Sequence, residues 1–298
     1  MFLRGNPNNR GPSVPRQFLP LLAGPNAQPF KMGSGRLELA RAIADRSNPL
    51  TARVLVNRVW LHHFGKGLVG TPSDFGLRSD PPTHPELLDH LATVFMQNGW
   101  SIKQLHRLIV LSAAYQQKSD DRPDCRRVDP ENSLLWKMNR QRLDFEATRD
   151  ALLAVSGRLD RKPGGPPDKD ILGAGRRRTV YGFLDRLQVP GLYRSFDFPS
   201  PDASSPQRDT TTIPQQALFL MNNPFVIACA QHLLQLPEIA GEKDAARRVE
   251  RLYRRLYGRG PTAEEISLAR EFTGGMEPSR WVRYAQGLLM ANEFVFLD

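Results

Sequence analysis

Apolar residues recur at helical spacing along most of the chain, and this pattern predicts a mainly α protein. The clearest case is a helix over residues 50–64 that ends at Gly65. Its predicted buried side is marked by large apolar residues at helical intervals: Leu55, Val59, Trp60 and Phe64. Further helices are predicted from near Ser34, over 143–156, from Pro214, from Pro224 and over 281–292.

Three sequences of the form Ser/Thr-x-x-Glu/Gln predict where helices begin. In such a capping box the two side chains satisfy backbone N–H groups that the first helical turn leaves free. The three sequences begin at Thr83, Ser101 and Thr262. Gly99 and Gly157 follow predicted helices and mark their ends.

Proline and glycine interrupt the helical pattern in several long loops. Residues 1–33 are predicted to be an irregular N-terminal linker, because prolines block regular structure there. The Gly/Pro-rich segment 157–175 is either a flexible insertion or an internal domain boundary. Residues 176–186, with β-branched and aromatic side chains, are the best strand candidate. We expect one multi-helix globular domain over 34–298, mainly α, with one or two short strands and long Pro/Gly-rich loops.

The charge balance is basic but does not favour nucleic acid as a partner. The 298-residue chain has a net charge of +10, with 33 arginines and only 8 lysines. Its basic runs are short and most have acidic neighbours, which is typical of solvated helix faces. No run of 18 apolar residues predicts a membrane span, and the first residues lack the apolar core of a signal peptide. The protein is expected to be cytoplasmic or the C-terminal part of something longer.

The sequence contains none of the common metal, nucleotide or haem motifs. Cys125 and Cys229 form no zinc-type spacing, and whether they pair is left open. His62 and His63 are adjacent on a predicted helix, so their side chains point about 100° apart. We therefore predict no metal site and no cofactor.

The segment 194–212 is the main candidate for a functional site. It passes from a Pro/Ser-rich stretch into a polar end that precedes the helix from Pro214. The polar end consists of Arg208, Asp209, Thr210, Thr211 and Thr212. One hydroxyl would cap the helix, so the remaining groups could hold an anion such as sulfate, phosphate or carboxylate at the helix N-terminus. The alternative, which we favour, is an internal polar network that pins the loop to the core.

Other polar residues extend this candidate site. Asp197 lies in the same loop, and Arg177 and Tyr181 lie in the predicted strand just before it. Two carboxylates such as Asp197 and Asp209 could act as acid and base in hydrolysis. A second charged group has i,i+3 and i,i+4 spacing, which is typical of a solvated or paired helix face. Its members are Arg142, Asp144, Glu146, Arg149 and Asp150.

Long ordered segments of the chain resemble a known family. They are NPLTARVLVNRVWLHHFGKGLV, TPSDFGLRSDPPTHPELLDHLA, RLDFEATRDALLAVSGRLD, SFDFPSPDASSPQRDTTTIPQQALFLMNN and the closing ANEFVFLD. These segments resemble the planctomycete family called domain of unknown function 1553, from about Arg4 to Asp298. That family has no established activity and no catalytic residues that could be transferred to this chain.

The resemblance implies a setting for the domain. Members of the family are usually large exported proteins with a sister domain of unknown function upstream, often preceded by a cytochrome-c-like domain. This chain has no C-x-x-C-H motif for haem attachment, so it resembles the isolated C-terminal domain. An exported or periplasmic location is implied for full-length relatives.

Three functions follow as expectations. The first is an accessory domain that binds the upstream domain or a separate partner protein, together with an anionic, sulfated or uronic polysaccharide. The second is a hydrolase or lyase acting on such a polymer through the Arg/Asp residues of the 194–212 loop. The third is nucleic-acid binding through the basic surface. The sequence specifies neither a reaction, a substrate nor an oligomeric state.

Overall fold

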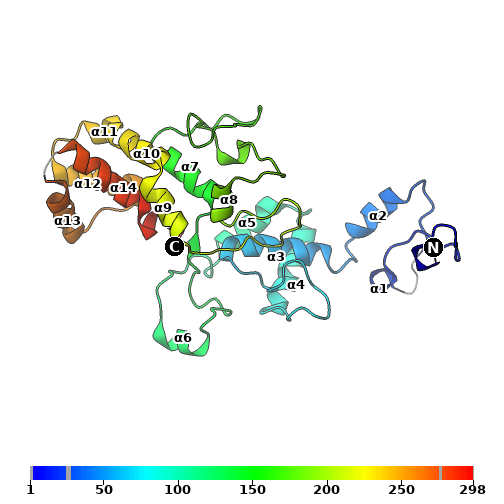
Figure 1. The fold of residues 1–298 in the computed structure, drawn as a ribbon. Helices are drawn as coiled ribbons and strands as arrows, with labels where there is room; N and C mark the ends of the chain where they lie inside the picture. Colours follow the sequence, from blue (N-terminus) through cyan, green and yellow to red (C-terminus); the bar gives the residue numbers. More distant parts are fainter. Residues whose placement is uncertain (1–2, 25–27, 275–276, 298) are drawn as a thin grey trace. The chain divides into compact units, whose positions relative to one another are not determined.

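The computed structural model describes residues 3–24, 28–274 and 277–297, and it divides into two compact units (Figure 1). Unit 1 is Met1–Asn139 and unit 2 is Arg140–Asp298. Each unit has a hydrophobic core of its own. The segment 157–175 lies within unit 2. Parts of the predicted linker (1–2 and 25–27) and the closing Asp298 lie outside the described residues.

Unit 1 is helical, and three of its helices supply most of its hydrophobic core. Its described elements are η1 (Leu3–Gly5), α1 (Pro20–Ala23), α2 (Arg36–Ile43), α3 (Thr51–Phe64), α4 (Pro85–Gln97), α5 (Ile102–Val110) and α6 (Pro123–Val128). Helix α3 packs against α4 and α5. Val59, Trp60 and Phe64 are buried as predicted, with the Trp60 and Phe64 rings stacked 4.2 Å apart. By contrast, α1 and α2 contain no buried residue.

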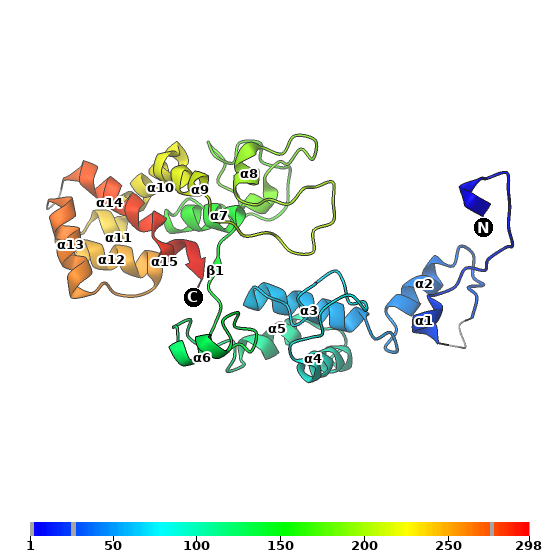
Figure 2. The ribbon, with the colours of Figure 1, turned by 60° about the horizontal axis from the view of Figure 1, so that its bottom comes forward.

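Unit 2 is a cluster of helices closed by a minimal sheet. Its described elements are β1 (Gln141–Arg142), α7 (Phe145–Val155), η2 (Thr179–Tyr181), α8 (Gly191–Ser195), α9 (Pro214–Asn222), α10 (Pro224–Gln235), α11 (Pro237–Ala240), α12 (Ala245–Tyr257), α13 (Ala263–Thr273), α14 (Pro278–Met290), α15 (Asn292–Val295) and β2 (Phe296–Leu297). Helix α10 packs along α14, and α12 and α13 lie beside α14 (Figures 1 and 2).

The two short strands form the only sheet among the described residues, so the predicted mainly α fold is confirmed. They pair antiparallel, with Gln141 opposite Leu297 and Arg142 opposite Phe296. This pairing joins the first and last elements of unit 2. The unit is therefore closed at the point where its chain enters.

The predicted strand over 176–186 is wrong. Its centre is the 3₁₀ turn η2, and only isolated bridges flank it, one of which joins Asp168 to Gly182. The physical reason is a local polar anchor, because the N–H and hydroxyl of Thr179 both donate to Asp150 Oδ1 of α7, at 2.7 and 2.6 Å. These hydrogen bonds turn the backbone towards α7 and leave no extended run to pair.

The predicted capping boxes have different outcomes. The box of Thr262 and Glu265 at the start of α13 is present in full. Ser101 caps α5 by accepting a hydrogen bond from the N–H of Gln104. The prediction for Thr83 is wrong, because His84 is the N-cap of α4 and Thr83 instead bonds to the carbonyl of Leu68 through its N–H and hydroxyl.

Helices α9 and α10 form a bent pair at the centre of unit 2. No single helix in the described ranges is long and apolar enough to cross a bilayer, although this pair, bent by 51°, meets the criteria of length and composition when taken together. Cys229 of α10 is fully buried, and both it and Cys125 are free thiols.

Candidate functional site

Arg208, the centre of the predicted site, is bound by carboxylates of the chain itself. Its guanidinium donates to both carboxylate oxygens of Glu146, at 2.8 and 2.9 Å, and lies 3.2 Å from Asp144 Oδ2. It also lies over the ring of Phe198, 5.1 Å from the centroid. Burial disfavours the charged guanidinium, but the hydrogen bonds and charge of Glu146 outweigh burial and raise the pKa of Arg208. Arg208 therefore fastens the loop to α7.

Asp197 and Thr211 form a second tie in the same loop. The N–H and hydroxyl of Thr211 donate to the two carboxylate oxygens of Asp197, at 2.8 and 2.7 Å. Asp197 has a left-handed backbone conformation with φ of 58°. Arg142 contacts the carbonyl of Thr211 and the side chain of Gln216, whose amide in turn donates to the carbonyl of Ser195. The loop end is thus held between α8 and α9.

The three threonines do not cap α9. Its N-cap residue is Ile213, which makes no side-chain cap hydrogen bond, and Thr210, Thr211 and Thr212 are exposed. Asp209 is exposed as well. The capping prediction is therefore wrong, because the hydroxyl of Thr211 is used by Asp197. An anion site on these residues stays a prediction.

Arg177 and Tyr181 form a separate cluster. The guanidinium of Arg177 lies over the ring of Tyr181, 4.1 Å from its centroid, and donates to the carbonyls of Gly164 and Pro166. The N–H of Gly164 donates to Tyr181 Oη at 3.0 Å. This pair holds the 164–166 turn, and no contact with Arg208 joins the two clusters within the described part of the chain.

The environment of Arg149 differs from the one that its spacing in the sequence predicts. The structure buries it completely, whereas its spacing in the sequence is typical of a solvated or paired face. Its guanidinium donates to the carbonyls of Ile171, Gly175 and Arg177, at 2.6, 2.9 and 2.8 Å, and to Thr179 Oγ1 at 3.1 Å. Burial lowers the pKa of Arg149. One buried arginine therefore organises the irregular segment between α7 and η2.

A cavity of about 490 Å³ opens beside this network. Its walls come from α7, η2, α8 and the loop after α8. The residues that line it are Asp144, Glu146, Ala147, Asp150, Arg178, Thr179, Val180, Gly182, Leu184, Tyr193 and Phe198. None of the residues singled out from the sequence as ligand-binding is part of this lining. Arg208 contacts it, because its guanidinium is paired with the lining carboxylates Asp144 and Glu146.

The carboxylates of this cavity are all occupied by partners in the chain. Glu146 and Asp144 contact Arg208, Asp144 also accepts from the N–H of Ala147 as the N-cap of α7, and Asp150 accepts from Thr179. Arrangements of this kind hold side chains in place. In the described ranges, no group of three or more histidine, cysteine, aspartate or glutamate side chains is placed to hold a metal ion.

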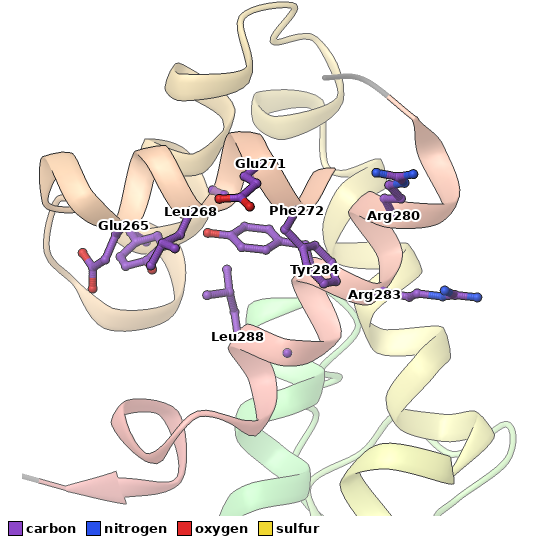
Figure 3. Close-up of a pocket in the computed structure, with 11 residues that line it drawn as sticks. Glu265, Leu268, Glu271, Phe272, Arg280, Arg283, Tyr284 and Leu288 are labelled. Atoms are coloured by element: carbon purple, nitrogen blue, oxygen red, sulfur yellow. The ribbon is translucent and has the colours of Figure 1, made fainter. Parts of the chain in front are cut away.

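A groove of unit 2 lies between α13 and α14 (Figure 3). It measures about 830 Å³. Leu268 and Phe272 of α13 line it with 59% and 51% of their surface exposed, and Tyr284 of α14 lies between the helices. Large apolar side chains are usually buried, so two in one groove form a notable apolar surface.

Charged residues mark the two ends of the groove. Glu265 lies at one end and Arg280 and Arg283 lie at the other (Figure 3). Arg259 holds Glu265 by two hydrogen bonds of 2.8 and 2.9 Å and also bonds to Glu293. The hydrogen bonds from Arg259 lower the pKa of Glu265 to about 2, so Glu265 is ionised at neutral pH and is paired with Arg259.

Sequence reasoning did not identify this groove, although a signal for it exists. On α13 the core-facing positions are Ala269 and Thr273, both fully buried. Leu268 and Phe272 are i,i+4 neighbours on an adjoining face, which widens the apolar stripe of the helix beyond what its own core requires. A second apolar pair of this kind indicates a surface that packs against something else.

Comparison with known proteins gives one match. The model of a family described as a protein of unknown function (PSD1, DUF1553) matches residues 35–273, which span both units. No curated protein and no solved structure matches the chain.

Proposed function

The chain belongs to the PSD1 family of proteins of unknown function (DUF1553), and from this premise we propose that it is a non-catalytic interaction module. Its α13–α14 groove would bind an apolar helix of a partner domain. The single observation that carries the proposal is the exposure of Leu268 and Phe272 in a groove of about 830 Å³.

The shape of the groove supports a helix as the occupant. An amphipathic helix binds by laying its apolar face between two helices, with anchors spaced at i, i+3, i+4 and i+7. Leu268 and Phe272 are spaced by one helical turn, and Tyr284 and Leu288 on α14 repeat that spacing. A methyl group added at Gly287 would meet no atom within 4 Å, so this wall of the groove is open to a partner.

The charges of the groove favour one orientation of that helix. Its C-terminal end, which carries the negative end of the helix dipole, would lie near Arg280 and Arg283. Its N-terminal end would lie near Glu265. The complementary partner is thus an apolar helix with basic residues in its first turn and acidic residues in its last turn.

The upstream sister domain of the family is the partner we propose. The test is to co-express this chain with that domain from a full-length relative and to measure the complex by size-exclusion chromatography and calorimetry. Leu268→Glu and Phe272→Glu should each weaken binding at least about tenfold, because each places a charge in an apolar contact. The matched control is Leu77→Glu, which changes a fully exposed leucine of unit 1.

Two results would contradict the proposal. One is a complex that survives both groove substitutions while each variant keeps the melting temperature of the original chain. The other is the lack of any complex at micromolar concentrations of both proteins.

The other expected functions receive less support from the geometry. A hydrolase or lyase site in the 194–212 loop stays a prediction, but Asp197 is already bound by Thr211, and Arg208 by Glu146. Nucleic-acid binding likewise stays a prediction, which a steep fall in affinity with salt would support. The exported location is part of the proposal because it follows from the resemblance to full-length relatives.

A further inference from the structure

We propose that the cavity beside α7 binds a neutral ligand rich in hydroxyl groups, of the size of one or two sugar rings. The cavity measures about 490 Å³, within the usual range for small-molecule sites. It shares no lining residue with the α13–α14 groove, so it is a separate cavity.

The first support is a tyrosine hydroxyl that borders the cavity and is not used within the described part of the chain. Tyr193 is 5% exposed and lines the cavity, and its hydroxyl makes no hydrogen bond with any residue that the structure describes. Burial, followed by the nearby charge of Glu146, raises the pKa of Tyr193, which keeps the hydroxyl protonated and able to donate. The oxygen itself is not fully buried, so it can donate to a ligand group in the cavity.

The second support is the glycine next to that phenol. Gly182 also lines the cavity, and a Cβ there would lie 3.1 Å from Tyr193 Oη and 3.0 Å from the carbonyl of Thr179. Any larger residue would therefore press on the hydroxyl. Glycine at this position therefore keeps a side chain from crowding Tyr193 Oη.

The third support is the balance of charge around the cavity. Asp144, Glu146 and Asp150 line it, and each lies within 4 Å of an arginine guanidinium. Three arginines make these contacts: Arg149, Arg178 and Arg208. These arginines offset the charges of the three carboxylates, although only Arg178 itself lines the cavity. Their remaining donor and acceptor positions suit neutral hydroxyl groups.

The apolar wall completes the choice of ligand class. The Tyr193 and Phe198 rings meet edge to face, with centroids 5.1 Å apart, and Val180 and Leu184 extend the same lining. A ring with polar edges and an apolar face, as in a hexose, matches a cavity that combines aromatic walls with charged hydrogen-bonding groups. The sulfated or uronic ligand expected from the sequence is less well matched to this cavity than a neutral one.

Three small probes that share a ring and differ in charge test the proposal. They are methyl β-D-glucopyranoside, glucuronic acid and glucosamine, titrated into the full chain and followed by saturation-transfer NMR. We expect saturable binding of the neutral probe, tighter than that of either charged probe. Tyr193→Phe should weaken it about fivefold, the effect of losing one hydrogen bond, while keeping the ring that packs in the core.

Controls separate this result from loss of folding. Tyr115→Phe, in unit 1, should leave binding unchanged, and Gly182→Ala should weaken it by narrowing the cavity. The proposal would be overturned if the neutral probe showed no saturable binding, if glucuronic acid bound more tightly, or if a folded Tyr193→Phe chain bound the neutral probe as well as the original.

Discussion

The 194–212 loop and the α13–α14 groove show opposite relations between sequence and surface. In the loop, polar side chains that look suited to a ligand find partners within the chain, as Arg208 does with Glu146. In the groove, apolar side chains that look like core remain exposed, as Leu268 and Phe272 do. Polar groups can satisfy one another locally, whereas an exposed apolar pair can be covered only by another surface. A cluster of polar residues is therefore the weaker indicator of a binding site.

The largest change in the free energy of unfolding should come from substitution of the buried Arg149, another polar side chain whose partners all lie within the chain. Arg149→Met keeps most of the side-chain volume but leaves the carbonyls of Ile171, Gly175 and Arg177 without a donor. We expect the free energy of unfolding to fall by about 3–5 kcal/mol, measured by urea denaturation. Arg270→Met, on an exposed position of α13, should change it by less than about 0.5 kcal/mol. A loss below about 1 kcal/mol for Arg149→Met would mean that the network does not organise the segment.

A moderate effect is expected for the tie between the loop and α7. Arg208→Ala should lower the free energy of unfolding by about 2 kcal/mol, because the mostly buried carboxylate of Glu146 loses a two-bond partner. Combining it with Glu146→Gln in a double-mutant cycle isolates the pair. Arg186→Ala is the control, since its contact with Asp202 is exposed and 3.9 Å long. An unchanged melting temperature for Arg208→Ala would show that the loop is held by other contacts.

The smallest change in the free energy of unfolding is expected for an exposed apolar residue of the α13–α14 groove. Leu268→Glu should change the free energy of unfolding by less than about 0.5 kcal/mol, because the side chain is 59% exposed. Leu289→Ala, at a fully buried position of α14, should cost about 2–5 kcal/mol. Thermal unfolding of both variants checks this contrast. If Leu268→Glu were as costly as Leu289→Ala, the groove would be part of the core and no partner would be needed to explain it.

Signals that depend on residues close together in the sequence predicted several elements correctly. The helix over 50–64 is present as α3 from Thr51 to Phe64, and Thr262 with Glu265 forms the expected capping box. Both depend on residues within a few positions of one another. A periodic apolar stripe has the same meaning wherever the helix lies in the fold, whereas the cap predicted at Thr83 was lost to the carbonyl of Leu68.

Features that depend on distant residues could not be predicted in this way. The segment 176–186 has the composition of a strand. Asp150, about thirty residues earlier, accepts hydrogen bonds from the N–H and hydroxyl of Thr179, and the backbone forms a turn there. Arg149 has the spacing of a surface residue, and its burial follows from carbonyls that arrive from a later segment. Local composition does not show which donors and acceptors tertiary packing will bring together.

The candidate site shows the same limit. The sequence identified Arg208, Asp197 and Thr211 as more than helix-capping residues, and the favoured interpretation, a network that pins the loop, agrees with their contacts. It did not identify Tyr193 or Glu146 as members of a cavity, because α7 and α8 meet only in the folded unit. Their sequence positions lie almost fifty residues apart.

The division of the chain between Asn139 and Arg140 has an evolutionary consequence. Each unit is one continuous stretch of sequence with its own core, so a single genetic cut could separate them and either piece could be inherited alone. The family match nevertheless runs across the junction, from residue 35 to residue 273. Members of the family therefore carry both units in one stretch of sequence. A task that needs both units would account for that arrangement.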